Sequence, residues 1–273
     1  MRVVPLSDHP GALLRQAQRR RATADRDAGR AYDKALAGHR ERVTQARAAR
    51  DQARAQRRWG AWLRSVVAVW QAQRQVPAAS RPGSQPTDEE QKLAAGVEGE
   101  RLVEAGLGQV LGDEWTLLRG YRNRHGEIDH LLIGPRGLFA IEVKHRNATI
   151  DCAGDRWWYS KYDKYGNLVG DRREMADRGG RSPSEQLNEP ATELAGFLSS
   201  RGCPVAIGRM VVLTHPRARL RSCASPTVHI VTSIRQIIGL VNSCPAAITA
   251  AERAELERLI VRDHGLHGKR RSS

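Results

Sequence analysis

The chain has 273 residues, of which 40% are hydrophobic, and it carries a formal net charge of +15 at pH 7. This length allows one good-sized core plus an appendage, and the basic excess favours a polyanionic partner, nucleic acid before an anionic membrane surface. The longest apolar run near the start, at residues 62–70, is too short to span a bilayer, and no secretory signal begins the chain. Four cysteines without C-x-x-C spacing argue against a zinc site. We therefore expect a cytoplasmic protein without stable membrane insertion.

Residues 1–75 form a basic arm that contains 17 Lys and Arg against six Asp and Glu. From residue 10 to about 74 the arm is rich in Ala, Arg and Gln, and this composition predicts one long helix or a pair of helices. Three interpretations stay open. The arm is a solvated, partly disordered basic helix, or it binds nucleic acid through counterion release, or it associates with another copy as a homo-oligomer through Trp59, Trp62 and Trp70.

Residues 76–92 form a linker by composition, because they are rich in Pro, Ser and Gln. A capping-box sequence predicts that a helix starts at about residue 88 and ends near residue 111. Gly96 and Gly99 of this helix would permit its backbone to approach a sheet closely.

Strands are predicted at residues 115–122, 127–133 and 138–144, with a short one near 148–150. The second and third are apolar on both faces, which is typical of central strands in an α/β sheet. A two- or four-residue loop between them places Asp129 directly opposite Glu142, with Lys144 on the same face. A three-residue loop with a glycine bulge would instead move Asp129 to the other face.

The two carboxylates and the lysine would then share the rim of a closed core. Burying such charges is costly unless they are paired or bind an ion, and a divalent metal ion is the usual ligand. The alternative is a salt-bridge cluster of Asp129, Glu142 and Lys144 without metal.

Residues 151–182 make a long polar connection, which in a compact domain is typical of a functional or mobile segment. The aromatic residues and lysines in it, including Trp157, Lys161 and Lys164, suit contacts with the bases and phosphates of a nucleic acid. Packing of Trp157 over the core is the open alternative. His145, directly after the preceding strand, could contact a phosphate.

The remaining segments predict an alternation of helices and strands. Helices are expected near 184–201, 233–242 and 249–263, strands near 205–213 and 227–231, and a disordered basic tail at 266–273. The resulting order, α-β-β-β-α-β followed by additions, is typical of an α/β domain.

Four sequence matches resemble the nuclease-related domain (NERD) family of the PD-(D/E)xK nuclease superfamily. They are residues 127–144 almost throughout, Gly96-x-x-Gly99-Glu100, Trp157, and Ser182-Pro183-x-x-Gln186. The resemblance covers roughly residues 93–235. It departs from the family pattern in two places, because no proline precedes Asp129 and because Ser182 replaces the usual asparagine.

The resemblance implies a nuclease-like domain at residues 93–265, with a restriction-endonuclease-like mixed sheet flanked by helices. It also implies hydrolysis of phosphodiester bonds, in DNA more than in RNA, with Mg²⁺ or Mn²⁺ as cofactor. The rival hypothesis is a module that keeps this fold and binds a nucleic acid or a protein partner without cutting.

Site roles follow from the same resemblance. Asp129 and Glu142 would ligate the metal, with the Val143 carbonyl as a third oxygen, and Lys144 would orient or deprotonate the attacking water. Glu100 would hold a metal-bound water or a second ion, or else be a surface charge. Gln186 would hydrogen-bond near the site or to the substrate, or else lie on a helix surface.

Overall fold

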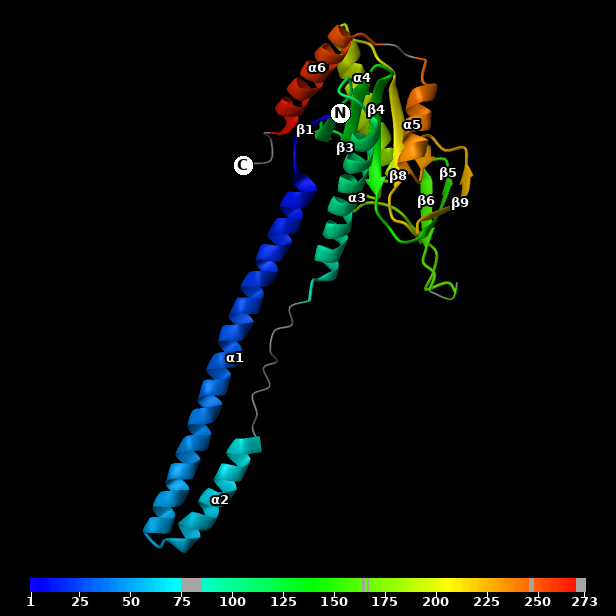
Figure 1. The fold of residues 1–273 in the computed structure, drawn as a ribbon. Helices are drawn as coiled ribbons and strands as arrows, with labels where there is room; N and C mark the ends of the chain where they lie inside the picture. Colours follow the sequence, from blue (N-terminus) through cyan, green and yellow to red (C-terminus); the bar gives the residue numbers. More distant parts are fainter. Residues whose placement is uncertain (75–84, 164, 166, 246–247, 269–273) are drawn as a thin grey trace. The chain divides into compact units, whose positions relative to one another are not determined.

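The structure, a computed structural model, describes residues 1–74, 85–163, 165, 167–245 and 248–268 (Figure 1). The chain divides into two compact units, one made of Met1–Leu13 with Gln91–Ser273 and the other of Leu14–Glu90. Among the described residues, no helix combines the length and the apolar character that crossing a bilayer requires.

The described residues of the second unit are mainly helical. This unit holds most of α1 (His9–Ala55), all of α2 (Trp59–Arg74) and the first residues of α3 (Asp88–Val110). Arg57 has a left-handed backbone (φ 56°) just after α1, and the Arg58 N–H bonds back to the Ala53 carbonyl at 3.0 Å, which ends the helix. The arm therefore contains two helices where the sequence allowed one or two.

The N-terminal boundary of the predicted arm is wrong. β1 (Arg2–Pro5) pairs in parallel with β2 (Thr116–Arg122), at the edge of the large sheet, so residues 1–13 belong with the domain. Val3 and Val4 explain the pairing, because their side chains pack against the cores on opposite faces of that sheet.

Two other predicted boundaries also move. α3 begins at Asp88, where the Thr87 hydroxyl accepts from the Glu90 N–H at 3.2 Å, so residues 88–92 of the predicted linker are helical. α6 (Ala250–Gly268) extends through residues 266–268, which were predicted to be disordered. The remainder of the predicted tail and residues 75–84 lie outside the described residues.

The large sheet has the strand order β1-β2-β3-β4-β8-β10. Its further strands are β3 (Glu127–Gly134), β4 (Gly137–Lys144), β8 (Ile207–Leu213) and β10 (His229–Val231). β2, β3 and β4 form an antiparallel meander, and β8 and β10 continue in parallel with β4. Gly134 pairs with Gly137, so the β3–β4 loop has two residues and the predicted even register is confirmed.

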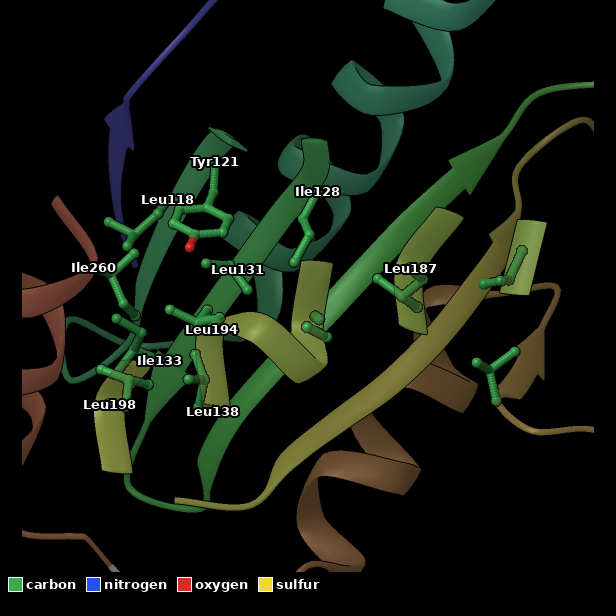
Figure 2. Close-up of a cluster of buried hydrophobic side chains, with 14 of the residues drawn as sticks. Leu118, Tyr121, Ile128, Leu131, Ile133, Leu138, Leu187, Leu194, Leu198 and Ile260 are labelled. Atoms are coloured by element: carbon green, nitrogen blue, oxygen red, sulfur yellow. The ribbon is translucent and has the colours of Figure 1, made fainter. Parts of the chain in front are cut away.

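Helices cover both faces of the large sheet, as the apolar strands predicted. α4 (Pro183–Ser200) and α6 pack on one face, while α3 and α5 (Ile234–Ser243) pack on the other. Figure 2 shows side chains of β2, β3 and β4 facing those of α4 and α6. Ile128 lies in this cluster together with Leu131, although strict alternation along β3 would place the two on opposite faces. The alternation breaks beside Gly120 of β2, which has φ +71° and falls between the neighbouring ladder pairs.

A smaller sheet has the order β7-β6-β5-β9 and occupies much of the predicted long loop. Its strands are β5 (Thr149–Ala153), β6 (Arg156–Ser160), β7 (Arg173–Glu174) and β9 (Arg219–Ala224). Ile150, Cys152 and Trp157 bury one side of this sheet in the cluster beneath α4. β9 was not predicted, because all of its residues are exposed and no apolar alternation marks it.

Candidate active site

Asp129 lies where the β3–β4 ladder ends, since His130 and Ile141 are the last paired residues. Its Oδ2 accepts a hydrogen bond from the Val143 N–H at 2.7 Å, so the side chain takes over from the backbone as the partner of β4. The aspartate is thereby held beside Glu142, as the predicted register required.

Lys144 joins β4 to α4. Its Nζ donates to Glu142 Oε1 at 2.6 Å and to Gln186 Oε1 at 3.0 Å. The Gln186 Nε2 donates in turn to the Arg181 carbonyl at 2.7 Å, which fixes the amide orientation. Gln186 therefore belongs to the cluster and is not a residue of the helix surface alone.

The start of α4 explains how Gln186 reaches this position. Ser182 is the N-cap, its hydroxyl accepting from the Glu185 N–H at 3.3 Å while Glu185 Oε2 accepts from the Ser182 N–H at 2.8 Å. Pro183 fits the first helical position, where no N–H is needed. Ser182 thus supplies the cap that asparagine also provides, and Gln186 falls one turn into the helix.

Glu100 is presented to the same end of the sheet by α3. A Cβ on Gly99 would lie 2.7 Å from the Cβ of His145, so only glycine permits this approach. A Cβ on Gly96 would meet nothing within 4 Å, and the predicted role of that glycine is wrong. Glu98 faces elsewhere and pairs with Arg101 at 2.8 Å.

The carboxylates repel one another. Burial, and then the charges of Glu142 and Glu100, raise the pKa of Asp129 well above its usual range. Burial, followed by the charge of Glu127, raises the pKa of Glu100 to about 7. For Lys144, burial acts to lower the pKa, but the attraction of Glu142 and Asp129 outweighs it, and the pKa is raised. The cluster has more negative charge than Lys144 can balance.

These side chains suit a hard divalent cation in donor chemistry and in charge, because they offer buried carboxylate oxygens that lack sufficient positive charge. Asp129 Oδ2 already accepts a hydrogen bond from the Val143 N–H, and Glu142 Oε1 already accepts one from Lys144 Nζ. Within the described ranges, no group of three or more His, Cys, Asp or Glu side chains is arranged to hold a metal ion. Binding a metal would therefore require side chains to rearrange around the cation.

If the β3–β4 register continued to the end of β3, Glu127 would lie opposite Lys144, but Glu127 pairs with Arg122 of β2 at 2.6 Å. The cause is the register, since Arg122 and Glu127 are cross-strand neighbours while the β3–β4 ladder has already ended. His130 is completely buried, and burial lowers its pKa to about 4.

The predicted nucleic-acid contact by Trp157 is wrong. Its side chain is completely buried, and its Nε1 donates to Ser184 Oγ at 3.0 Å, so the indole helps to seat α4. His145 bonds through Nδ1 to Thr214 Oγ1 at 2.9 Å and stays partly exposed. Lys161 is exposed and its role stays a prediction, and Lys164 lies outside the described residues.

An α/β domain with mixed sheets flanked by helices, and with an acid–acid–lysine cluster at a hairpin end, is compatible with a nuclease-like fold. Residues 95–214 match the family model described as the nuclease-related domain, NERD. The chain thus carries a domain of the NERD family, and the resemblance noted in the sequence is confirmed. No curated protein and no solved structure matches the chain.

Proposed function

We propose that this protein is a metal-dependent nuclease that hydrolyses phosphodiester bonds, with DNA as the preferred substrate over RNA. The observation that supports this most is the cluster at the rim of the core, in which Lys144 pairs with Glu142 while the neighbouring carboxylate, Asp129, accepts only from the Val143 N–H. A buried acid pair of this kind is costly to folding, which is expected where the acids serve chemistry.

In the proposed reaction, Asp129, Glu142 and the Val143 carbonyl would hold Mg²⁺ or Mn²⁺, with Glu100 in support. When bound, the cation would polarise the phosphate and lower the pKa of a bound water. Lys144 would then release its hydrogen bond to Glu142 and donate to the attacking water or to a phosphate oxygen. Gln186 would keep the ammonium group directed at the site. Glu100, whose pKa is about 7, could carry a proton near neutral pH.

A second candidate function is nucleic-acid or partner binding without cleavage. The observation in its favour is the direct Lys144–Glu142 ion pair, in which the lysine and one carboxylate already satisfy each other. The basic arm could serve either function by binding the same nucleic acid, or it could join copies through its exposed Trp59 and Trp70. Light scattering of the full chain over a concentration series tests for homo-oligomers.

The deciding experiment is cleavage of linear, circular and single-stranded DNA, and of RNA, with Mg²⁺ or Mn²⁺. Wild type is compared with Glu142→Ala and Lys144→Ala, and with Glu98→Ala, which removes an exposed carboxylate two residues from Glu100. We expect cutting by wild type and Glu98→Ala, and its loss in the other two. Salt-dependent binding without cutting would establish the second candidate.

A further inference from the structure

The small sheet is attached to the end of the large sheet that carries Glu142 and Lys144. β4 leads into β5 through residues 145–148, and β8 leads into β9 through residues 214–218 (Figure 1). The two connections are joined, because His145 bonds to Thr214 and its ring lies 5.0 Å from that of His215. Any long polymer cut at the acid cluster therefore has the small sheet as an immediate neighbour.

The small sheet and its connections hold the positive charge of the domain. Residues 75–273 contain 28 Lys and Arg against 24 Asp and Glu. Residues 145–175 and 215–225, which make up this sheet, contain nine against five and so account for the same excess of four. The rest of that stretch is neutral in sum, and a polyanion would be drawn to this side.

Arginines on this sheet are ordered by aromatic rings. On the side of β6 away from the core, the guanidiniums of Arg156 and Arg172 lie 5.2 and 4.4 Å from the centre of the Trp158 ring. Arg172 also lies 3.7 Å from the Asp151 carboxylate, whereas Arg156 has no ion pair among the described residues. Such stacking orders a guanidinium without cancelling its charge, so the N–H groups of Arg156 stay able to bind phosphate. On the helices the opposite holds, since Arg101 and Arg258 are each neutralised by a glutamate one turn away.

A pocket of about 330 Å³ opens on the same sheet. It is lined by Asn147, Ala148, Thr149, Tyr162, Asp163, Arg217 and Arg219. Within the described part of the chain, neither Arg217 nor Arg219 has a carboxylate within ion-pair distance, while Tyr162 is 41% exposed. The Asp163 carboxylate is engaged by the N–H groups of Tyr165 and Asn167 at 2.8 and 2.9 Å. The pocket thus offers two cations and one aromatic ring, beside the hydrogen-bonded carboxylate of Asp163.

We propose that the exposed side of the small sheet, with this pocket, is a docking surface for a single strand of nucleic acid. Nucleic acid as the partner rests on the proposed function. Stacking rings interleaved with arginines suit unpaired bases and phosphates, and a pocket at the small end of the ligand range has room for about one nucleotide, not for a duplex. The strand lies across β6 and β9 and leads to the acid cluster.

The test is fluorescence anisotropy of a labelled oligothymidylate with the full chain in EDTA, so that no cleavage intervenes. Arg217→Ala/Arg219→Ala is compared with Arg101→Ala/Arg258→Ala, which removes the same charge from ion-paired helix positions. We expect the first pair to weaken binding about tenfold and to lower the salt slope by about 1.4, as for two lost single-strand phosphate contacts, and the second pair to change little. If both pairs of substitutions weakened oligothymidylate binding equally, the proposed docking surface would be overturned.

Two further measurements distinguish a failure of the docking surface from a failure of the proposed function. A hairpin duplex should lose less affinity than the oligothymidylate in the Arg217/Arg219 variant, and an equal loss would overturn the assignment to a single strand. Wild-type cleavage with Mg²⁺ is measured in parallel. If wild type cuts nothing but the Arg217/Arg219 variant binds selectively less, the docking surface is supported and the nuclease proposal is contradicted. If wild type cuts normally and the variant shows no selective loss, the nuclease proposal is supported and the docking surface is contradicted.

Discussion

Two aspartates in neighbouring parts of the domain show opposite electrostatics. Asp151 on β5 is buried, yet the Arg221 guanidinium and then the Ser222 hydroxyl hold its pKa below the usual range. Asp129 on β3 is surrounded by other carboxylates, and its pKa is raised. The difference shows which acid serves the fold, because Asp151 has its counter-charge within the chain while Asp129 lacks enough of it.

The largest expected difference between them is in activity. Asp129→Asn keeps an oxygen that can accept from Val143 N–H but removes the charge, and we expect cleavage to fall by about 100-fold or more. Asp151→Asn should retain wild-type cleavage per folded molecule. Initial rates at saturating Mg²⁺ measure both, and similar losses in the two variants would remove the distinction.

The pH dependence of stability should also differ in sign. Glu100 shares the repulsion around Asp129, and its pKa of about 7 in the folded state is above the ordinary 4.5. The folded state therefore holds an extra proton between these values, and metal-free stability should fall as pH rises from 4.5 to 7, by up to about 3 kcal/mol. For Asp151, with its lowered pKa, stability should instead be lost in acid, below about pH 4.

Calorimetric unfolding in EDTA from pH 4 to 8 tests this, with Glu100→Gln as the comparison. The variant should show a smaller decline, because only the contribution of Asp129 remains, and it should exceed wild type above pH 7. Parallel curves for the two proteins would mean that Glu100 titrates normally.

Stability at neutral pH should be lowered by Asp151→Asn and not by Asp129→Asn. Asp151 accepts from Arg221 at 2.9 and 2.6 Å and from Ser222 at 2.8 Å, and losing charged hydrogen bonds of this kind costs about 2 kcal/mol. Asn at position 129 relieves repulsion in the metal-free protein. Urea titrations in EDTA would give the two free energies of unfolding, and a loss at Asp129 as large as that at Asp151 would contradict the comparison.

The smallest expected effect is at Gln186. Its amide orients Lys144 without a charge of its own, so Gln186→Ala should lower kcat about tenfold with little change in KM. Ser199→Ala, at an exposed position of the same helix, is the matched control. A purely structural role would change the free energy of unfolding and leave the kcat of folded enzyme intact.

The central hairpin could be predicted because its evidence is local. A two-residue loop fixes the register of Asp129 and Glu142, and continuous apolar runs indicate a sheet covered on both faces. β1 and β9 could not be predicted in this way, because each is a short strand whose partner is distant in sequence. The Lys144–Gln186 contact likewise spans 42 residues, and only the packing of α4 brings it about.

Trp157 was misassigned for a related reason. Aromatic residues next to lysines indicate either a stacking surface or a buried edge, and the sequence allowed both for this position. The structure separates the alternating sides of β6, with Trp157 buried and Trp158 partly exposed beneath Arg172.

The pairing of β1 with β2 makes the helical arm an insertion between an edge strand and the helix α3. Removing residues 1–75 would delete that strand together with the arm and leave the backbone of β2 unpaired along an open edge, which invites aggregation. Excising residues 14–86 and bridging the gap with a flexible linker would keep all six strands. Only this second deletion would separate the contribution of the arm from the integrity of the sheet.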